Sequence, residues 1–216
     1  MNIDLFNKKI LKFSNSNISF TEEEQEQLIK DATIKYGEFL DALHFSWRDD
    51  PNASNTPYRV AKMWVKEIAK GCYNTPPKIT VFDNVDNYTG IVFQGDIDIT
   101  SLCAHHHQTI TGKAYVAYIP SETGKIVGLS KLNRVVDYFA RRPQVQENLT
   151  NQIASYLDNI LLDNLGIAVM IKGKHGCVKN RGIQQDSTMV TTKLLGAFLT
   201  EEKARSEFYK CIDNIK

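Results

Sequence analysis

The chain has 216 residues, of which 42% are hydrophobic and 24% charged, as in an ordinary globular protein. A formal net charge of +1 excludes a global electrostatic attraction to nucleic acid or to a membrane surface. No apolar run is long enough to span a bilayer, and the start of the chain lacks the pattern of a signal peptide. The four cysteines are too scattered for a disulfide framework, which favours a reduced, cytoplasmic protein.

The N-terminal third of the chain predicts two helices behind a polar arm. Residues 1–20 are rich in Asn and Ser and are expected to be loosely held. Thr21 and Glu24 form a capping box that begins the first helix. Its apolar positions recur at helical spacing: Leu28, Ala32, Tyr36, Phe39 and Leu43.

The second helix is expected to begin at Pro57, which is tolerated at the first helical position, and to end at Gly71. Its polar side carries Arg59, Lys62 and Lys66, which on spacing alone is an ordinary solvated helix face. These charges would serve an anionic ligand if folding or assembly gathered them with other basic groups.

Beyond residue 77 the pattern changes to that of a meander sheet. Strands are expected at residues 91–99, 113–119, 167–172 and 189–195, with residues 120–124 as a hairpin loop and 125–129 as a returning strand. The second strand has two apolar faces, one with Ala114, Val116 and Tyr118 and the other with Tyr115, Ala117 and Ile119.

Two helices are expected between the second and third long strands. Ser130 is expected to cap the first, Pro143 to open the second, and residues 201–215 to form a last helix. The fold class is therefore α+β. So few strands leave open sheet edges, and joining the edges of several subunits into a larger barrel is the expected remedy.

Metal-ligating residue types gather in the segment Ser101-Leu102-Cys103-Ala104-His105-His106-His107. Cys103 and His106 can share an ion only across a turn, because residues three apart on a flat strand face opposite ways. Cys177 lies in a second cluster, Lys174-His175-Gly176-Cys177. Three protein ligands and one open position are the pattern of a catalytic zinc. The plain alternative is a small buried cysteine beside ordinary histidines.

A second pattern points to an anion. The helix after Ser130 carries Lys131 and Arg134 near its start, where acidic residues are usual. Basic side chains beside free backbone N–H groups suit a phosphate, although two solvated charges explain the pattern equally well. Arg181, close to Cys177 in sequence, would add to such a site.

Glu147 falls in the first turn of the helix expected after Pro143. Compensation of the helix dipole is its ordinary role. Its functional interpretation is a carboxylate that accepts the N1–H and N2 amino donors of guanine, a pair that adenine lacks.

Six ordered blocks, from about Thr56 to the C-terminus, resemble the GTP cyclohydrolase I family. The blocks are Thr56-Pro57-x-Arg59-Val60-Ala61-Lys62-Met63, Ser101-Leu102-Cys103-x-His105-His106, Gly112-Lys113-Ala114-x-Val116-Ala117-Tyr118-Ile119-Pro120, Gly128-Leu129-Ser130-Lys131-Leu132-Asn133-Arg134, Arg142-Pro143-Gln144-Val145-Gln146-Glu147 and His175-x-Cys177-Val178-Lys179-x-Arg181-Gly182.

The resemblance implies a tunnelling fold assembled as a homodecamer of two pentamers, with active sites at subunit interfaces. It implies hydrolytic opening of the guanine imidazole ring of GTP, with release of formate and formation of 7,8-dihydroneopterin triphosphate. That reaction would be a first step of pterin and tetrahydrofolate, or of 7-deazaguanine, biosynthesis. In this frame residues 1–72 are an N-terminal helical extension and residues 73–216 the catalytic domain.

The resemblance also assigns roles to residues. It implies Zn²⁺ held by Cys103, His106 and Cys177, and proton transfer by His105 and His175. It implies that the base is held by Glu147 and Gln146. Ribose or phosphates would be contacted by Ser130, Lys131, Arg134, Arg181, Lys62 and Arg59.

The sequence departs from the family pattern at Ala104, where Glu is typical, and at His107, where an apolar residue is usual. These changes bear on rate, pH optimum and metal preference. Two rival functions make different demands on the sequence. A zinc nucleobase deaminase needs H-x-E and P-C-x-x-C, and neither motif occurs. A non-catalytic zinc module needs a fourth protein ligand, for which the candidates are His107, Cys72 and Cys211.

Overall fold

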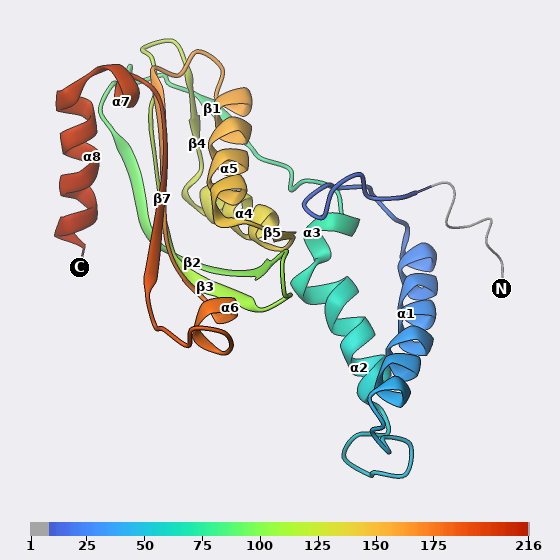
Figure 1. Ribbon diagram of the computed structural model, residues 1–216. Coiled ribbons are helices and arrows are strands. Elements are labelled where there is room, and N and C mark those ends of the chain that lie inside the picture. The colour runs from blue at the N-terminus through green and yellow to red at the C-terminus, as the bar shows by residue number, and fades with distance from the viewer. Residues whose placement is uncertain (1–8, 216) are drawn as a thin grey trace. The chain divides into compact units, whose positions relative to one another are not determined.

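The computed structural model describes residues 9–215 and forms two compact units, Met1–Thr75 and Pro76–Lys216 (Figure 1). The N-terminal unit contains the helices α1 (Glu22–Ala42), α2 (Thr56–Met63) and α3 (Lys70–Tyr73), with a π-helical turn, η2 (Trp64–Ile68), between the last two. The single second helix expected from the sequence is therefore interrupted near its end. In the described part of the chain, no helix combines the length and apolar character needed to cross a membrane.

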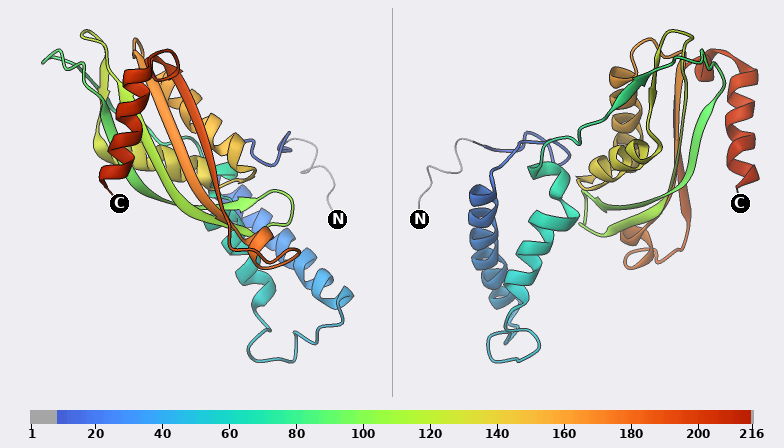
Figure 2. Two further views of the ribbon diagram at one scale, coloured as in Figure 1. Left: turned by 60° about the vertical axis from the view of Figure 1, so that its left-hand side comes forward. Right: turned by 180° about the vertical axis from the view of Figure 1, so that it is seen from behind.

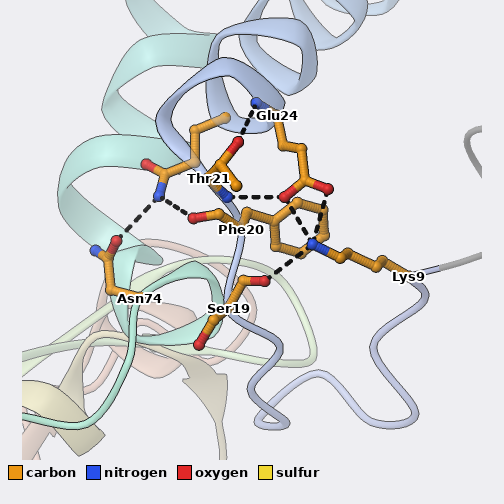
Figure 3. Close-up of polar contacts among 7 residues, drawn as sticks. Lys9, Ser19, Phe20, Thr21, Glu24 and Asn74 are labelled. Carbon is orange, nitrogen blue, oxygen red and sulfur yellow. Dashed lines mark hydrogen bonds and ion pairs between the residues drawn. The ribbon is translucent and has the colours of Figure 1, made fainter.

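The capping box at the start of α1 is confirmed, because the Thr21 hydroxyl accepts from the Glu24 N–H and the Glu24 carboxylate accepts from the Thr21 N–H. The expectation of a loose arm is wrong for residues 9–20 (Figure 3). Lys9 Nζ donates to the Glu24 carboxylate at 2.6 Å and to Ser19 O at 3.2 Å. The Asn17 amide donates to three backbone oxygens of residues 71–74. Residues 1–8 lie outside the described residues.

The expected apolar face of α1 is partly wrong. Ile29 and Leu40 are buried, whereas Phe39 and Leu43 are exposed. The buried face therefore lies about one position away from the predicted stripe. Ile29, Ala61 and Val65 form a buried cluster, and Leu28 and Ala32 of the predicted stripe are partly buried against it.

The C-terminal unit is organised on a curled five-stranded sheet with the order β5-β2-β3-β6-β7. Its strands are β2 (Val92–Cys103), β3 (Thr109–Ile119), β5 (Pro143–Gln144), β6 (Gly166–His175) and β7 (Thr188–Gly196). The four long strands pair antiparallel, and β5 pairs parallel with the end of β2. The expected meander, with two helices between its second and third long strands, is confirmed, and each long strand extends beyond its predicted range.

Helices cover both faces of this sheet. The helices α4 (Leu129–Ala140) and α5 (Gln146–Ile160) lie on one face, and α7 (Ala197–Thr200) and α8 (Glu202–Asn214) lie on the other (Figure 2). The alternation predicted for β3 is confirmed. Ala114, Val116 and Tyr118 join the core under α4 and α5, and Tyr115, Ala117 and Ile119 join the core under α7 and α8.

Three local expectations in this unit are wrong. The strand after the loop, β4 (Lys125–Val127), pairs with β1 (Val81–Asp83) rather than returning along β3, since β2 and β6 occupy both edges of β3. Pro143 begins the short edge strand β5, where a missing N–H is tolerated, and α5 begins at Gln146. Ser130 lies inside α4, whose cap is Gly128, and no side chain caps that helix.

Candidate active site

Three chain segments meet at one end of the sheet (Figure 1). The first is the turn that follows β2, and the second is the start of α5, which β5 ties to β2 through the pair Cys103 and Gln144. The third is the end of β6, where His175 pairs with Ile110 of β3. The short helix α6 (Gly176–Lys179) continues directly from β6. Sheet pairing therefore brings the two Cys-His clusters of the sequence to the same place.

The turn after β2 is fixed by backbone hydrogen bonds. Cys103 N–H donates to Gln108 O at 2.8 Å, and His107 N–H donates to Cys103 O at 2.9 Å. His107 adopts a left-handed φ of 51°. The turn exposes His105 and His106 while Cys103 stays buried. The sequence-based expectation that this segment leaves regular strand geometry is confirmed.

The two cysteine thiols of the predicted ligand set lie near enough to influence each other. Burial raises the pKa of the Cys177 thiol, its hydrogen bond with Cys103 raises it further, and the charge of Arg181 acts in the opposite direction. His105 Nδ1 lies 3.8 Å from Cys103 Sγ. All four cysteines of the chain are free. The raised pKa of Cys177 favours its thiol form, whose proton a metal ion would displace.

His106 Nε2 lies 3.1 Å from Nη1 of Arg181. A guanidinium can only donate, so this imidazole nitrogen accepts and is unprotonated, with its lone pair engaged by Arg181. Within residues 9–215, no three His, Cys, Asp or Glu side chains converge as a ready ligand set. The donor types nevertheless fit zinc: two neighbouring thiols, and an unprotonated imidazole nitrogen on the turn that follows Cys103.

His175 lies at the end of β6 and is half-buried. Burial lowers the pKa of its imidazole, and the nearby charge of Glu147 opposes that shift. Its Nε2 lies 2.9 Å from Oε1 of Gln146, whose side chain is fully buried. Glu147 is the next residue of α5 and is exposed. The start of α5 thus carries the buried amide of Gln146, which contacts His175, and next to it the exposed carboxylate of Glu147.

The basic residues proposed for phosphate fall into three groups. Ser130, Lys131 and Arg134 lie on the first two turns of α4, whose first turn has no acidic residue. Arg181 follows α6 and contacts His106, as described above. The remaining two, Arg59 and Lys62, are exposed on α2 of the N-terminal unit.

Two residues of the site, buried Gln144 and half-buried Thr191, were not singled out by the sequence. The backbone oxygen of Gln144 accepts from Ala104 N–H at 3.2 Å, which anchors the turn of the histidines. Thr191 of β7 accepts from the Gln146 amide at 3.0 Å. Neither residue has a spacing signal, since their partners lie 40 and 45 positions away in the chain.

The site defines a class of protein, an enzyme with acid–base groups beside a candidate metal site. It combines neighbouring thiols, exposed imidazoles, a half-buried histidine and basic residues at a helix start. The family model for GTP cyclohydrolase I matches residues 36–213. The chain is 48% identical over 161 residues to "GTP cyclohydrolase 1" of Aeromonas salmonicida (strain A449), covering 74% of this chain and 72% of the relative. It is 46% identical over 177 residues to the protein of the same name from Enterobacter sp. (strain 638), covering 81% and 78%.

A solved structure of the archaeosine synthase QueF-Like in the apo form aligns with a TM-score of 0.38 and 16% identity, over 48% of this chain and 92% of that one. The family match and the two relatives agree over most of the chain. This chain belongs to the GTP cyclohydrolase I family and is an enzyme of that family.

Proposed function

We propose that this enzyme opens the imidazole ring of GTP by hydrolysis, releases formate and forms 7,8-dihydroneopterin triphosphate, as a first step of pterin and tetrahydrofolate, or of 7-deazaguanine, biosynthesis. The observation that carries the proposal is that sheet pairing brings the segment of Cys103, His105 and His106 to the end of β6, where His175 and Cys177 lie, near enough for Cys103 to act on the pKa of Cys177. Family membership supports it, because both relatives described above are named as GTP cyclohydrolases.

Cys103, Cys177 and His106 would hold Zn²⁺. When bound, the ion would supply Lewis acidity and a source of hydroxide near neutral pH for attack at C8 of the guanine ring. The protein's part at this position is to bring two thiols near each other and to supply the unprotonated Nε2 of His106, which a metal ion would take over from Arg181.

Proton transfer in this proposal falls to His105 and His175. His175 is favoured as neutral imidazole because burial lowers its pKa, so it can accept a proton and later return it to a purine nitrogen as the ring opens. Glu147, exposed at the start of α5, would accept the N1–H and N2 amino donors of the base.

The triphosphate would lie at the start of α4. Ser130, Lys131 and Arg134 stand there at a helix start that no side chain caps, and the absence of an acidic residue in the first turn leaves the helix dipole uncompensated. Arg181 would add charge from the loop after α6. Arg59 and Lys62 would add charge from α2 of the same chain or of a neighbouring one.

The proposal includes the family's assembly, a homodecamer of two pentamers in which sheets of a tunnelling fold join into a barrel. Residues 73–216 would be the catalytic part and residues 1–72 a helical extension. Free cysteines suit a reducing compartment, so the location proposed is the cytoplasm.

Incubation of the purified protein with GTP tests the function directly. We expect formate and, after oxidation, a fluorescent pterin in equal amounts. The His175→Ala variant is the control and should give neither product. Absence of formate from the wild-type protein would refute the proposed activity.

A further inference from the structure

The Gln146 side chain is enclosed in a hydrogen-bond network at the first position of α5. Its Nε2 lies 3.1 Å from Ile171 O, 3.1 Å from Met189 O and 3.0 Å from Thr191 Oγ1. Its Oε1 lies 2.9 Å from His175 Nε2. The residue has 0% relative exposure. All of its polar atoms are therefore used inside the protein, which leaves none directed at a substrate.

The orientation of this amide is fixed by its partners. Two of the three groups around Nε2 are backbone carbonyl oxygens, which can only accept. Turning the amide over would place Oε1 against both carbonyls and leave three buried acceptors facing each other. An unsatisfied buried acceptor costs about 1–3 kcal/mol, so the observed orientation is the stable one.

This orientation determines the tautomer of His175. An amide oxygen cannot donate, so His175 Nε2 must carry the hydrogen in the bond to Gln146 Oε1. In the neutral ring the free lone pair is then on Nδ1. We propose that Gln146 is a positioning residue that holds His175 as the Nε2–H tautomer, so that Nδ1 is the atom that accepts and returns the proton during ring opening. The inference rests on the proposed function for its catalytic part and replaces a direct contact of Gln146 with the base.

The backbone of β6 is shaped to admit this contact. A Cβ placed on Gly173 would lie 2.3 Å from Gln146 Oε1, closer than real Cβ contacts allow. A side chain at position 173 would therefore displace the oxygen from His175. Gly173→Ala thus disturbs the same contact as a change of Gln146 itself, while keeping every donor and acceptor of the amide.

The tautomer can be measured on the full-length protein by solid-state ¹⁵N NMR after labelling of histidine, with His175→Asn to assign the resonance. We expect protonated Nε2 and unprotonated Nδ1 for His175 in the wild-type protein. Gln146→Met and Gly173→Ala should both give a mixture of tautomers. Gln152→Met, the same substitution on the same helix at a residue that bonds no histidine, should leave the spectrum unchanged. Protonated Nδ1 in the wild-type protein would overturn the proposal.

Kinetics separate positioning from base contact. Both variants keep His175 and lose only the fraction that adopts the other tautomer, so kcat should fall in proportion to that fraction, by about twofold to tenfold. KM for GTP should stay within about twofold, since no ground-state contact is removed. A rise in KM with unchanged kcat in Gln146→Met would overturn the positioning role. If the wild-type protein released no formate, the proposed function would fall, and the NMR measurement would still decide the tautomer.

Discussion

At the scale of single residues, the site depends on which atoms carry protons. Burial and the contact with Cys103 raise the pKa of Cys177, and burial lowers the pKa of His175. Both shifts favour the neutral form of the side chain concerned. A metal ion that displaced the thiol protons of Cys103 and Cys177 would be bound by two thiolates, and their negative charges would balance the charge of the ion.

The metal site gives the first prediction. Cys103→Ser and Cys177→Ser should each lose zinc and turnover, because a three-ligand site cannot spare a thiolate. Elemental analysis of the purified variants measures the metal, and formate release measures turnover. Cys211→Ser on α8 is the matched control and should keep both. A full complement of zinc in either ligand variant would show that the ligand set is wrong.

The phosphate site gives the second prediction. Lys131 and Lys203 are both lysines in the first turn of a helix, α4 and α8 respectively. Removing either charge should leave the melting temperature unchanged or slightly higher, because a cation is unfavourable at a helix start. Only Lys131→Ala should weaken the binding of GTP. We expect a loss of affinity of about tenfold, because one charge-assisted hydrogen bond is worth about that much.

Guanosine binding is the internal reference for that experiment. It lacks the phosphates, so its affinity should be the same in wild-type protein and in Lys131→Ala. Equal weakening of GTP and guanosine, measured by calorimetry, would refute the phosphate assignment for Lys131.

At the scale of elements, local signals predicted local structure well. The capping box at Thr21 and the two apolar faces of β3 depend on neighbouring residues and are confirmed. The prediction that a helix opens at Pro143 was wrong because the strand that pairs with this segment, the end of β2, lies about 40 residues away in the chain. The role of Gln146 was invisible for the same reason, since its partners lie on β6 and β7.

The start of α1 gives a prediction of pH dependence. The pKa of Glu24 is held below its ordinary value of 4.5, chiefly by Lys9 and also by the Thr21 N–H. Its folded pKa is depressed, so the stabilisation is present above pH 4.5 and is lost as the pH falls through the lower folded value. Glu24→Gln should therefore be less stable than wild type at neutral pH, and the difference should shrink in acid.

Tryptophan fluorescence measures this effect selectively, because both tryptophans, Trp47 and Trp64, lie in the N-terminal unit. The matched control is Glu38→Gln, which removes an exposed carboxylate of the same helix that pairs with Lys35. It should change the melting temperature little. A difference between wild type and Glu24→Gln that grew as the pH fell below 4.5 would contradict the assignment.

At the scale of the whole molecule, the sheet has open edges. Within residues 9–215, β7 pairs only with β6, and β5 covers β2 only at Leu102 and Cys103. Val190 on β7 is 52% exposed. Unpaired strand edges are templates for pairing with another chain, and a closed ring of subunits removes them. The observed edges therefore support the proposed decamer.

The assembly gives the last prediction. The prediction applies if each active site is composite and Lys62 is supplied by the neighbouring chain, so that Lys62 and His175 at one site come from different chains. Lys62→Ala and His175→Ala homo-oligomers should each be inactive, and mixed oligomers formed by unfolding and refolding the two together should regain part of the activity, because some interfaces then hold one intact residue from each chain. Light scattering should give the mass of a ten-chain assembly for all of these proteins. The control is each variant unfolded and refolded by itself, which should remain inactive. A fully active monomer at the assay concentration would defeat the assembly proposal, whereas normal assembly without complementation would show that Lys62 and His175 belong to the same chain at each site.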